Sequence, residues 1–294
     1  MPTLIGFGAI LLWAALALLT SLTTRLPLFE WLALTFGLAT LLSLPMLLRR
    51  GALASLRAVP VGGWALGIVG LFGYHAFYML ALKNAPTAQA GLIAYLWPLL
   101  IVLLSMLGQP LGRWTLPVIG GGLGLFGAGL LVFDPAEGGF RAEYAAGYGF
   151  ALVCALLWSG YSVLNRRYSA VPTVAVVVYC GAAALGGLGL SLAFEDWVTP
   201  RGLEWVGLIG LALGPMGLAF FVWDFGTKHG NVTLLGALSY FAPLLSTVLL
   251  VLAGRAQPTW ALGLATLLIV GGAGLAALGL RRGGGAGRDA EPEA

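Results

Sequence analysis

Seven aromatic side chains lie deep inside long apolar stretches, where they could hold a flat or cationic ligand. They are Trp13, Tyr74, Tyr78, Tyr95, Trp97, Trp158 and Tyr240. Tyr74 and Tyr78 are four residues apart and therefore share one face of a helix. Rings stack on tryptophan and tyrosine, and an ammonium group is attracted to a ring face. Cavity lining and plain packing both remain open for this set, and the prolines near Trp97 and Tyr240 favour a cavity.

Two prolines interrupt apolar stretches just after these aromatics, in Tyr95-Leu96-Trp97-Pro98 and Tyr240-Phe241-Ala242-Pro243. Proline lacks an N–H and clashes with the carbonyl four residues back, which frees the carbonyls of Ala94 and Ser239. In lipid such a break persists only where protein or a water-filled cavity satisfies the freed group. Interrupted helices at matching positions of two halves are typical of transporter binding sites. We predict that Pro98 and Pro243 are hinges or gates, and that Ser239 belongs to the binding site.

Few polar side chains lie inside the apolar stretches. His75 could transfer protons, although a lone histidine more commonly only forms hydrogen bonds. His75 and Ser159 join the candidate binding residues. Asp224 precedes Lys228 by four residues, so a helical ion pair is available to it, and a coupling-ion role is the alternative. Lys83 and Lys228 end equivalent stretches, and we expect both to extend to the membrane interface.

Motifs of catalysis and of metal binding are absent from the sequence. It contains no phosphate-binding glycine loop, no His-x-x-x-His pair and no Gly-x-Ser-x-Gly nucleophile. Cys154 and Cys180 lie in apolar stretches and lack the spacing of zinc or redox sites. We therefore expect no catalytic residues, no metal site and no cofactor, and we expect that the chain is not an enzyme.

The composition places these residues in a membrane, because 60% of the chain is hydrophobic and 9% is charged. No soluble domain needs so much apolar surface. The net charge of +4 forms no basic patch, so we expect the lipid bilayer as a partner and no nucleic acid. About 20 apolar residues cross a bilayer as a helix. Ten such stretches lie near 4–22, 29–48, 62–82, 88–107, 113–133, 146–165, 173–194, 203–227, 231–253 and 258–280.

The second half of the chain repeats the first at a single offset of 145 residues (243 − 98). The offset pairs Trp158 with Trp13, Pro172 with Pro27, Lys228 with Lys83 and Tyr240 with Tyr95. Five helices per copy is an odd number, so the second copy begins on the opposite side of the membrane. The predicted fold class is an all-α integral membrane protein with ten transmembrane helices in two inverted five-helix repeats. The repeats are 1–138 and 139–282, and a disordered cytoplasmic tail, 283–294, follows them.

The distribution of lysine and arginine predicts the orientation. One set of connections, together with the tail, holds ten of them: Arg49, Arg50, Arg57, Arg113, Arg166, Arg167, Lys228, Arg281, Arg282 and Arg288. The other set holds five: Arg25, Lys83, Arg141, Arg201 and Arg255. The richer side faces the cytoplasm, so both termini are predicted to be cytoplasmic.

The fifth and tenth stretches are rich in glycine, including Gly120, Gly124 and Gly272. Small residues let helix backbones approach closely in lipid. We interpret these helices as scaffold packed within one chain. A homodimer seam is the alternative, and the sequence leaves monomer and homodimer open.

With these features the chain resembles the drug/metabolite transporter superfamily, within it the EamA-type permeases, and most closely the bacterial aromatic amino acid exporters. The resemblance covers residues 1–282 and is carried by Ile10-Leu11-Leu12-Trp13, Gly73-Tyr74-His75-Ala76-Phe77-Tyr78-Met79-Leu80-Ala81-Leu82 and Ala94-Tyr95-Leu96-Trp97-Pro98-Leu99. Many members carry a glutamate after the fourth and ninth helices. Here those places read Leu107-Gly108-Gln109 and Ala253-Gly254-Arg255, which leaves the energy coupling open.

The resemblance implies an inner-membrane transporter that exports aromatic or other apolar amino acids and related small metabolites by alternating access. An exporter of flat cationic drugs is the nearest alternative, because an aromatic box also suits cations. A membrane enzyme or assembly factor is disfavoured by the absence of a reactive cluster. An ion channel is disfavoured by the uncharged aromatic lining.

Overall fold

The computed structural model describes residues 1–132, 141–255, 257 and 259–285, and all secondary structure in this part is helical. Nine helical stretches in these residues are long and apolar enough to cross a membrane, and a shorter apolar helix spans Thr115–Leu131. The chain is a multi-pass membrane protein.

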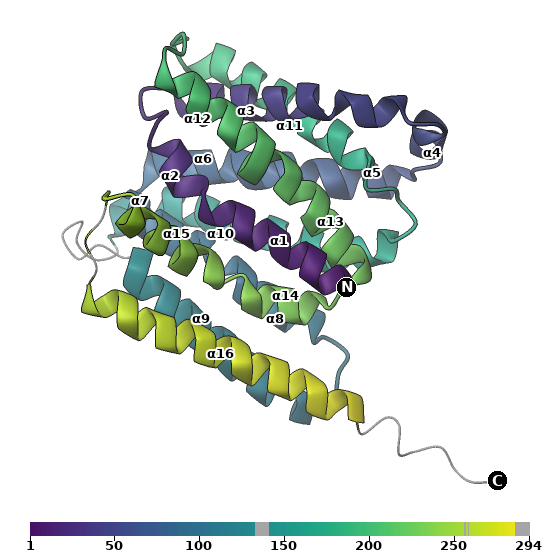
Figure 1. Cartoon of the computed structure of the whole chain (residues 1–294), viewed down its shortest axis with the longest axis vertical. Coiled ribbons are helices and arrows are strands. Elements are labelled where there is room, and N and C mark those ends of the chain that lie inside the picture. The colour runs from purple at the N-terminus through teal and green to yellow at the C-terminus, as the bar shows by residue number, and fades with distance from the viewer. Residues whose placement is uncertain (133–140, 256, 258, 286–294) are drawn as a thin grey trace.

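The first half contains α1 (Pro2–Ala14), α2 (Leu16–Thr20), α3 (Leu28–Ser43), α4 (Ala52–Arg57), α5 (Val61–Ile68), α6 (Tyr74–Asn84), α7 (Thr87–Ala94), α8 (Trp97–Ser105) and α9 (Thr115–Val132). The second half contains α10 (Ala145–Leu164), α11 (Ala175–Phe194), α12 (Leu203–Leu213), α13 (Ala219–His229), α14 (Val232–Leu238), α15 (Phe241–Leu252) and α16 (Trp260–Gly285). Figure 1 shows them as one bundle, in which α9 and α16 lie side by side at one edge.

The two predicted proline breaks are present. One membrane span is divided between α7 and α8, and another between α14 and α15. Pro98 and Pro243 each lie in the first turn of the second piece, where a missing N–H is tolerated because it has no partner within the helix. The carbonyl of Ser239 is not free, however, since it accepts a hydrogen bond from the Ala242 N–H at 3.1 Å.

Two further spans contain a π-helical turn that the sequence pattern did not predict. The turns are Val69–Gly73, between α5 and α6, and Gly214–Leu218, between α12 and α13. Their first residues are 145 positions apart (214 − 69). Pro215 accounts for the second turn, because proline cannot continue the hydrogen bonding of an α-helix. A π turn also redirects backbone carbonyls, which makes such turns common at functional sites.

Helices α9 and α16 pack backbone against backbone. A side chain added at Gly120 would place its Cβ 2.3 Å from the Gly272 carbonyl oxygen, so only glycine fits at this crossing. This close approach confirms the predicted packing of the two glycine-rich helices within one chain. The pair forms a wall along one edge of the bundle, beside α8, α14 and α15.

One end of the bundle is tied together by carboxylates that connect the two halves. Glu195, just after α11, accepts hydrogen bonds from the Phe29 and Glu30 N–H groups at the start of α3. It also pairs with Lys83 at 2.5 Å. Arg25 and Glu204 form a bidentate pair at 2.7 and 2.8 Å. The prediction that Lys83 extends to the membrane interface stays a prediction: the residue is exposed at the end of α6, where Glu195 pairs with it.

The structure describes only some of the residues at the predicted limits of the repeats and of the tail. The boundary at 138/139 lies outside the described residues. Helix α16 continues to Gly285, so the last helix ends close to the predicted start of the tail, and 286–294 lie outside the described residues.

Candidate functional site

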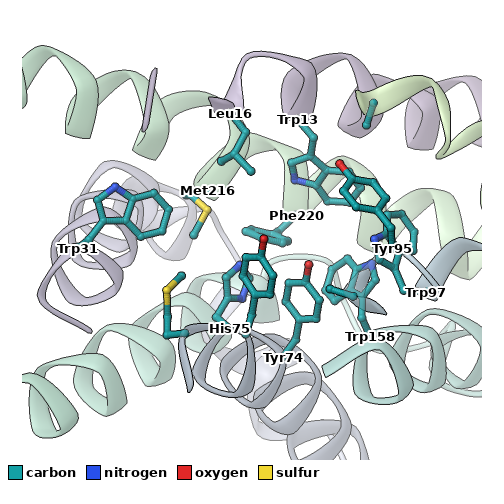
Figure 2. Close-up of a pocket in the computed structure, with 14 residues that line it drawn as sticks. Trp13, Leu16, Trp31, Tyr74, His75, Tyr95, Trp97, Trp158, Met216 and Phe220 are labelled. Atoms are coloured by element: carbon teal, nitrogen blue, oxygen red, sulfur yellow. The ribbon is translucent and has the colours of Figure 1, made fainter. Parts of the chain in front are cut away.

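A chamber of about 140 Å³ lies within the bundle and is lined mainly by aromatic side chains from both halves (Figure 2). Its lining residues are Trp13, Leu16, Trp31, Tyr74, His75, Tyr78, Met79, Ala94, Tyr95, Trp97, Trp158, Met216, Phe220 and Ala242. None of these is a lysine, an arginine or a carboxylate. The chamber therefore offers ring faces, three tyrosine hydroxyls and one imidazole.

Three tryptophans from α1, α8 and α10 pack together in the chamber lining, and a fourth, from α13, lies behind them. Trp158 on α10 lies 5.9 Å from Trp13 and 6.4 Å from Trp97 between ring centroids, in edge-to-face geometry. Behind it, Trp223 on α13 stacks on Trp158 at 6.0 Å. Such pairs contribute about 0.5–1.5 kcal/mol each beyond the area they bury. The cluster fixes the ring planes that a ligand would meet.

The two π turns hold chamber side chains in place. In the second turn, the carbonyl of Pro215 accepts a hydrogen bond from the Trp13 indole N–H at 3.1 Å. In the first turn, the carbonyl of Leu71 accepts from His75 Nδ1 at 2.8 Å. Because a carbonyl only accepts, Nδ1 carries the proton, and Nε2 of the neutral ring is an acceptor. Each break in regular helix geometry thus supplies the carbonyl that orients one ring.

Tyrosine hydroxyls provide most of the polar groups of the chamber. Tyr74 and Tyr78 stack nearly parallel at 6.2 Å, as their spacing predicts. Figure 2 shows the Tyr74 hydroxyl oxygen pointing away from the helix that carries it, and the Tyr95 hydroxyl oxygen beside the Trp13 ring. These groups can accept a hydrogen bond from an ammonium group or donate one to a carbonyl oxygen.

Seven of the ten residues proposed from the sequence line the chamber: Trp13, Tyr74, His75, Tyr78, Tyr95, Trp97 and Trp158. Ser159, Ser239 and Tyr240 do not. The hydroxyls of Ser159 and Ser239 donate to carbonyls of their own helices, those of Leu156 and Leu235. Tyr240 is fully buried and packs against Gly124 of the α9–α16 wall. Its repeat equivalent, Tyr95, faces the chamber instead.

Several lining residues escaped prediction. Trp31, which was not among the candidate residues, is only 8% exposed and donates its indole N–H to Thr23. Phe220 lies 5.6 Å from His75 and occupies the repeat-equivalent position (220 − 145 = 75). Ala242 is likewise the equivalent of Trp97 (242 − 145 = 97). Applying the offset to the candidate residues would have found Phe220 and Ala242.

The predicted ion pair of Asp224 and Lys228 is confirmed, at 2.8 Å. Both side chains are buried, so the expectation that Lys228 extends to the membrane interface is wrong. Asp224 also accepts hydrogen bonds from Tyr161, Asn165 and Thr173. Lys228 donates a second bond to the carbonyl of Val171. The network joins α13 to α10 and to the connection before α11, outside the chamber lining.

Within the described residues, no three His, Cys, Asp or Glu side chains gather in a way that could hold a metal ion. Cys154 and Cys180 are buried free thiols. Cys154 donates to the carbonyl of Ala151. Both occupy packing positions between helices.

The model of the EamA-like transporter family matches residues 2–133 and again residues 145–278. The aromatic amino acid exporter YddG of Ancylobacter novellus is 50% identical over 281 residues, which cover 95% of this chain and 98% of that protein. The aromatic amino acid exporter YddG of Escherichia coli is 27% identical, over 96% of this chain and 98% of its own. A crystal structure of a protein 49% identical superimposes with a TM-score of 0.89, over 96% of this chain and 98% of the other.

Proposed function

Because the chain belongs to the EamA-like transporter family, we propose that it exports aromatic and other apolar amino acids across the bacterial inner membrane. The observation that carries the proposal is the aromatic chamber between the two halves. The two relatives named as aromatic amino acid exporters support it. The substrate leaves chemically unchanged, so no catalytic group takes part.

The chamber suits an aromatic amino acid better than a flat cation. Its ring faces stack on a substrate ring, and the tyrosine hydroxyls with His75 Nε2 accept hydrogen bonds from an ammonium group. No carboxylate lines it, so a permanently charged drug would lose its hydration without gaining an ionic partner. An amino acid carries both charges on one small group, which lowers this cost.

The panel of transported substrates tests this function. Counterflow in proteoliposomes should show phenylalanine, tyrosine and tryptophan exchanging faster than alanine. A planar quaternary ammonium dye should compete weakly. If the dye competes better than phenylalanine, the drug-exporter alternative replaces this proposal.

The topology proposed with this function has ten crossings in two inverted repeats, with both termini in the cytoplasm. The 145-residue offset, the two separate matches to the family model and the equivalent π turns support a duplication. The helix over Thr115–Leu131 then provides the remaining crossing beside the nine longer ones. Five crossings per copy place the copies in opposite orientations.

Thiol labelling checks the orientation. A cysteine at exposed Asp196 should react with a membrane-impermeant maleimide added outside intact cells, and a cysteine at exposed Arg167 should react only after lysis. The native thiols are buried, which keeps the background low. A cysteine near Glu137, outside the described residues, should behave like the one at Asp196. The reverse pattern would overturn the orientation.

Alternating access requires the inner pieces of the broken spans, α8 and α14, to separate. They now pack closely: a Cβ at Gly236 would lie 3.0 Å from the carbonyl oxygen of Pro98. Ser105 and Thr233 share a hydrogen bond of 2.8 Å across the same seam. We propose that Pro98 and Pro243 are the hinges about which this seam opens.

Replacing either hinge proline with alanine should slow transport more than it lowers stability. A new backbone hydrogen bond stabilises the straight helix by about 1 kcal/mol, so turnover should fall about fivefold. Pro117→Ala is a matched control, because Pro117 lies in the first turn of the scaffold helix α9. Turnover in proteoliposomes and melting temperature in detergent provide the comparison. Equal losses of folded protein and activity would make both prolines purely structural.

A further inference from the structure

A second cavity, of about 390 Å³, opens at the end of the bundle where α8 ends and α14 begins. The polar part of its lining is Ser105, Gln109, Arg113, Arg166, Asn231 and Thr233. These residues come from both halves of the chain. Unlike the chamber, this cavity is predominantly polar and contains two positive charges.

The two guanidinium groups have no carboxylate partner within the described part of the chain. Each of the ion pairs found there joins other residues. Among the described residues, the Arg113 guanidinium donates to the Gln109 side-chain oxygen, at 3.2 Å. Two like charges that line one cavity repel each other, so an anion between them would stabilise both. The planar fork of a guanidinium group matches a carboxylate in geometry.

This cavity and the aromatic chamber lie at the two ends of one helix seam. Helix α8 runs from Trp97, in the chamber lining, to Ser105, in the cavity lining. The Ser105–Thr233 hydrogen bond closes the seam between α8 and α14 at the cavity. If α8 and α14 separate along this seam, the polar cavity opens into the aromatic chamber. We call the polar cavity the antechamber. The chamber lacks a cation, and the antechamber supplies two.

The arginines have no counterparts in the other copy of the repeat. The 145-residue offset relates Arg113 to Pro258 (113 + 145) and Arg166 to Ser21 (166 − 145). The nearest arginines in those two connections are Arg255 and Arg25, and Arg25 is already paired with Glu204, so the two mouths differ in their free positive charge. This asymmetry suits a protein that captures its substrate at one mouth and releases it at the other.

We propose that Arg113 and Arg166 form a first binding site for the carboxylate of the amino acid substrate at the inner mouth. The inference rests on the proposed export of amino acids and adds a recognition step to it. The ammonium group and the side chain are recognised later, in the chamber. The antechamber discriminates by the carboxylate alone.

Uptake into inside-out vesicles of neutral lipid tests the site. Arg166→Gln and Arg113→Gln should raise the half-saturating phenylalanine concentration about tenfold, because each removes a charge-assisted hydrogen bond. Inhibition by phenylalaninamide, which keeps the ring and ammonium group but lacks the carboxylate, should be unchanged. Arg167→Gln is the matched control, since it removes an exposed neighbouring charge outside the cavity. Arg166→Lys should recover part of the affinity.

Each contrary outcome has a distinct meaning. Equal losses for phenylalanine and its amide, or an equal effect of Arg167→Gln, would overturn the carboxylate site. Effects confined to vesicles that contain phosphatidylglycerol would assign the arginines to a lipid headgroup instead. Wild-type affinity in both variants would remove the inference and leave the proposed export intact. Failure of the wild type to transport any amino acid would overturn both.

Discussion

Trp158→Phe is expected to weaken phenylalanine binding by up to about fivefold while leaving alanine exchange nearly unchanged, because a whole ring pair contributes about 1 kcal/mol beyond burial and the smaller ring keeps part of it. Trp158 is the central ring of the chamber and is only 2% exposed. It lies 5.3 Å from Tyr74 as well as close to the other tryptophans. The phenylalanine ring fills most of the same space, so the fold is kept, but it offers the substrate a smaller surface for stacking.

Trp158→Ala is expected to have a larger but less specific effect. Removing a buried tryptophan costs about 3–5 kcal/mol of stability, so loss of transport would mix unfolding with loss of recognition. The phenylalanine substitution is therefore the sharper test, and Tyr78→Ala is a second, half-buried chamber variant. Trp64→Phe is the matched control, since Trp64 packs on Tyr179 at 5.8 Å outside the chamber lining.

Competition assays in proteoliposomes measure the effect, with phenylalanine and alanine as competing substrates. If Trp158→Phe weakens both in equal proportion, the rings serve packing, and the amino acid assignment loses its main physical support. If the control variant behaves like Trp158→Phe, the chamber has no special role among the aromatic clusters of the bundle.

Much of the helix arrangement could be predicted from the sequence because the bilayer imposes it. Backbone groups in lipid must be satisfied within each span, so apolar length and proline positions indicate helices and breaks. The break before Pro98 is present where its sequence places it. The π turn at Val69–Gly73 could not be predicted, since no proline marks it and its register depends on neighbouring helices.

The sequence did not predict how each helix is rotated about its axis, and therefore which of its side chains face the chamber. In spans that are apolar on every side, no polar face indicates which residues point inward. Tyr240 and Tyr95 are repeat equivalents, yet Tyr240 packs on Gly124 and Tyr95 faces the chamber. The offset pairs Gly124 with Ile269, so the wall that receives Tyr240 has no equivalent surface for Tyr95. The two copies thus keep the same residue at this position, although its neighbours in the folded chain differ.

The burial of Lys228 was missed for a related reason. A lysine at a helix end normally extends to the interface. Here Asp224 and the Val171 carbonyl accept its donors inside the bundle, and these partners come together only through the packing of α13 against the connection before α11. Spacing along one helix predicted the ion pair but not its surroundings.

Asp224→Ala should lower the free energy of unfolding by about 3–5 kcal/mol, because it leaves the Lys228 ammonium buried without its counter-ion. The double change Asp224→Leu with Lys228→Met should recover part of that loss, since it removes both charges together but still leaves the Tyr161, Asn165 and Thr173 donors without this acceptor. Melting temperatures in detergent provide the measurement. Arg141→Gln is a control: its partner Glu143 is largely exposed, and breaking an exposed pair changes stability by about 1 kcal/mol or less.

Asp224→Asn separates a structural role from a coupling role. The amide keeps an oxygen that accepts hydrogen bonds from Tyr161, Thr173 or Lys228, so the loss of stability should be smaller than for alanine. If the carboxylate only ties α13 to its neighbours, the variant should transport with an unchanged pH dependence. If the folded variant instead loses its pH dependence or its ability to concentrate substrate against a gradient, Asp224 carries the coupling ion. The double variant provides the same test without either charge, because a structural pair replaced by apolar side chains can still transport, whereas an ion-coupling pair cannot.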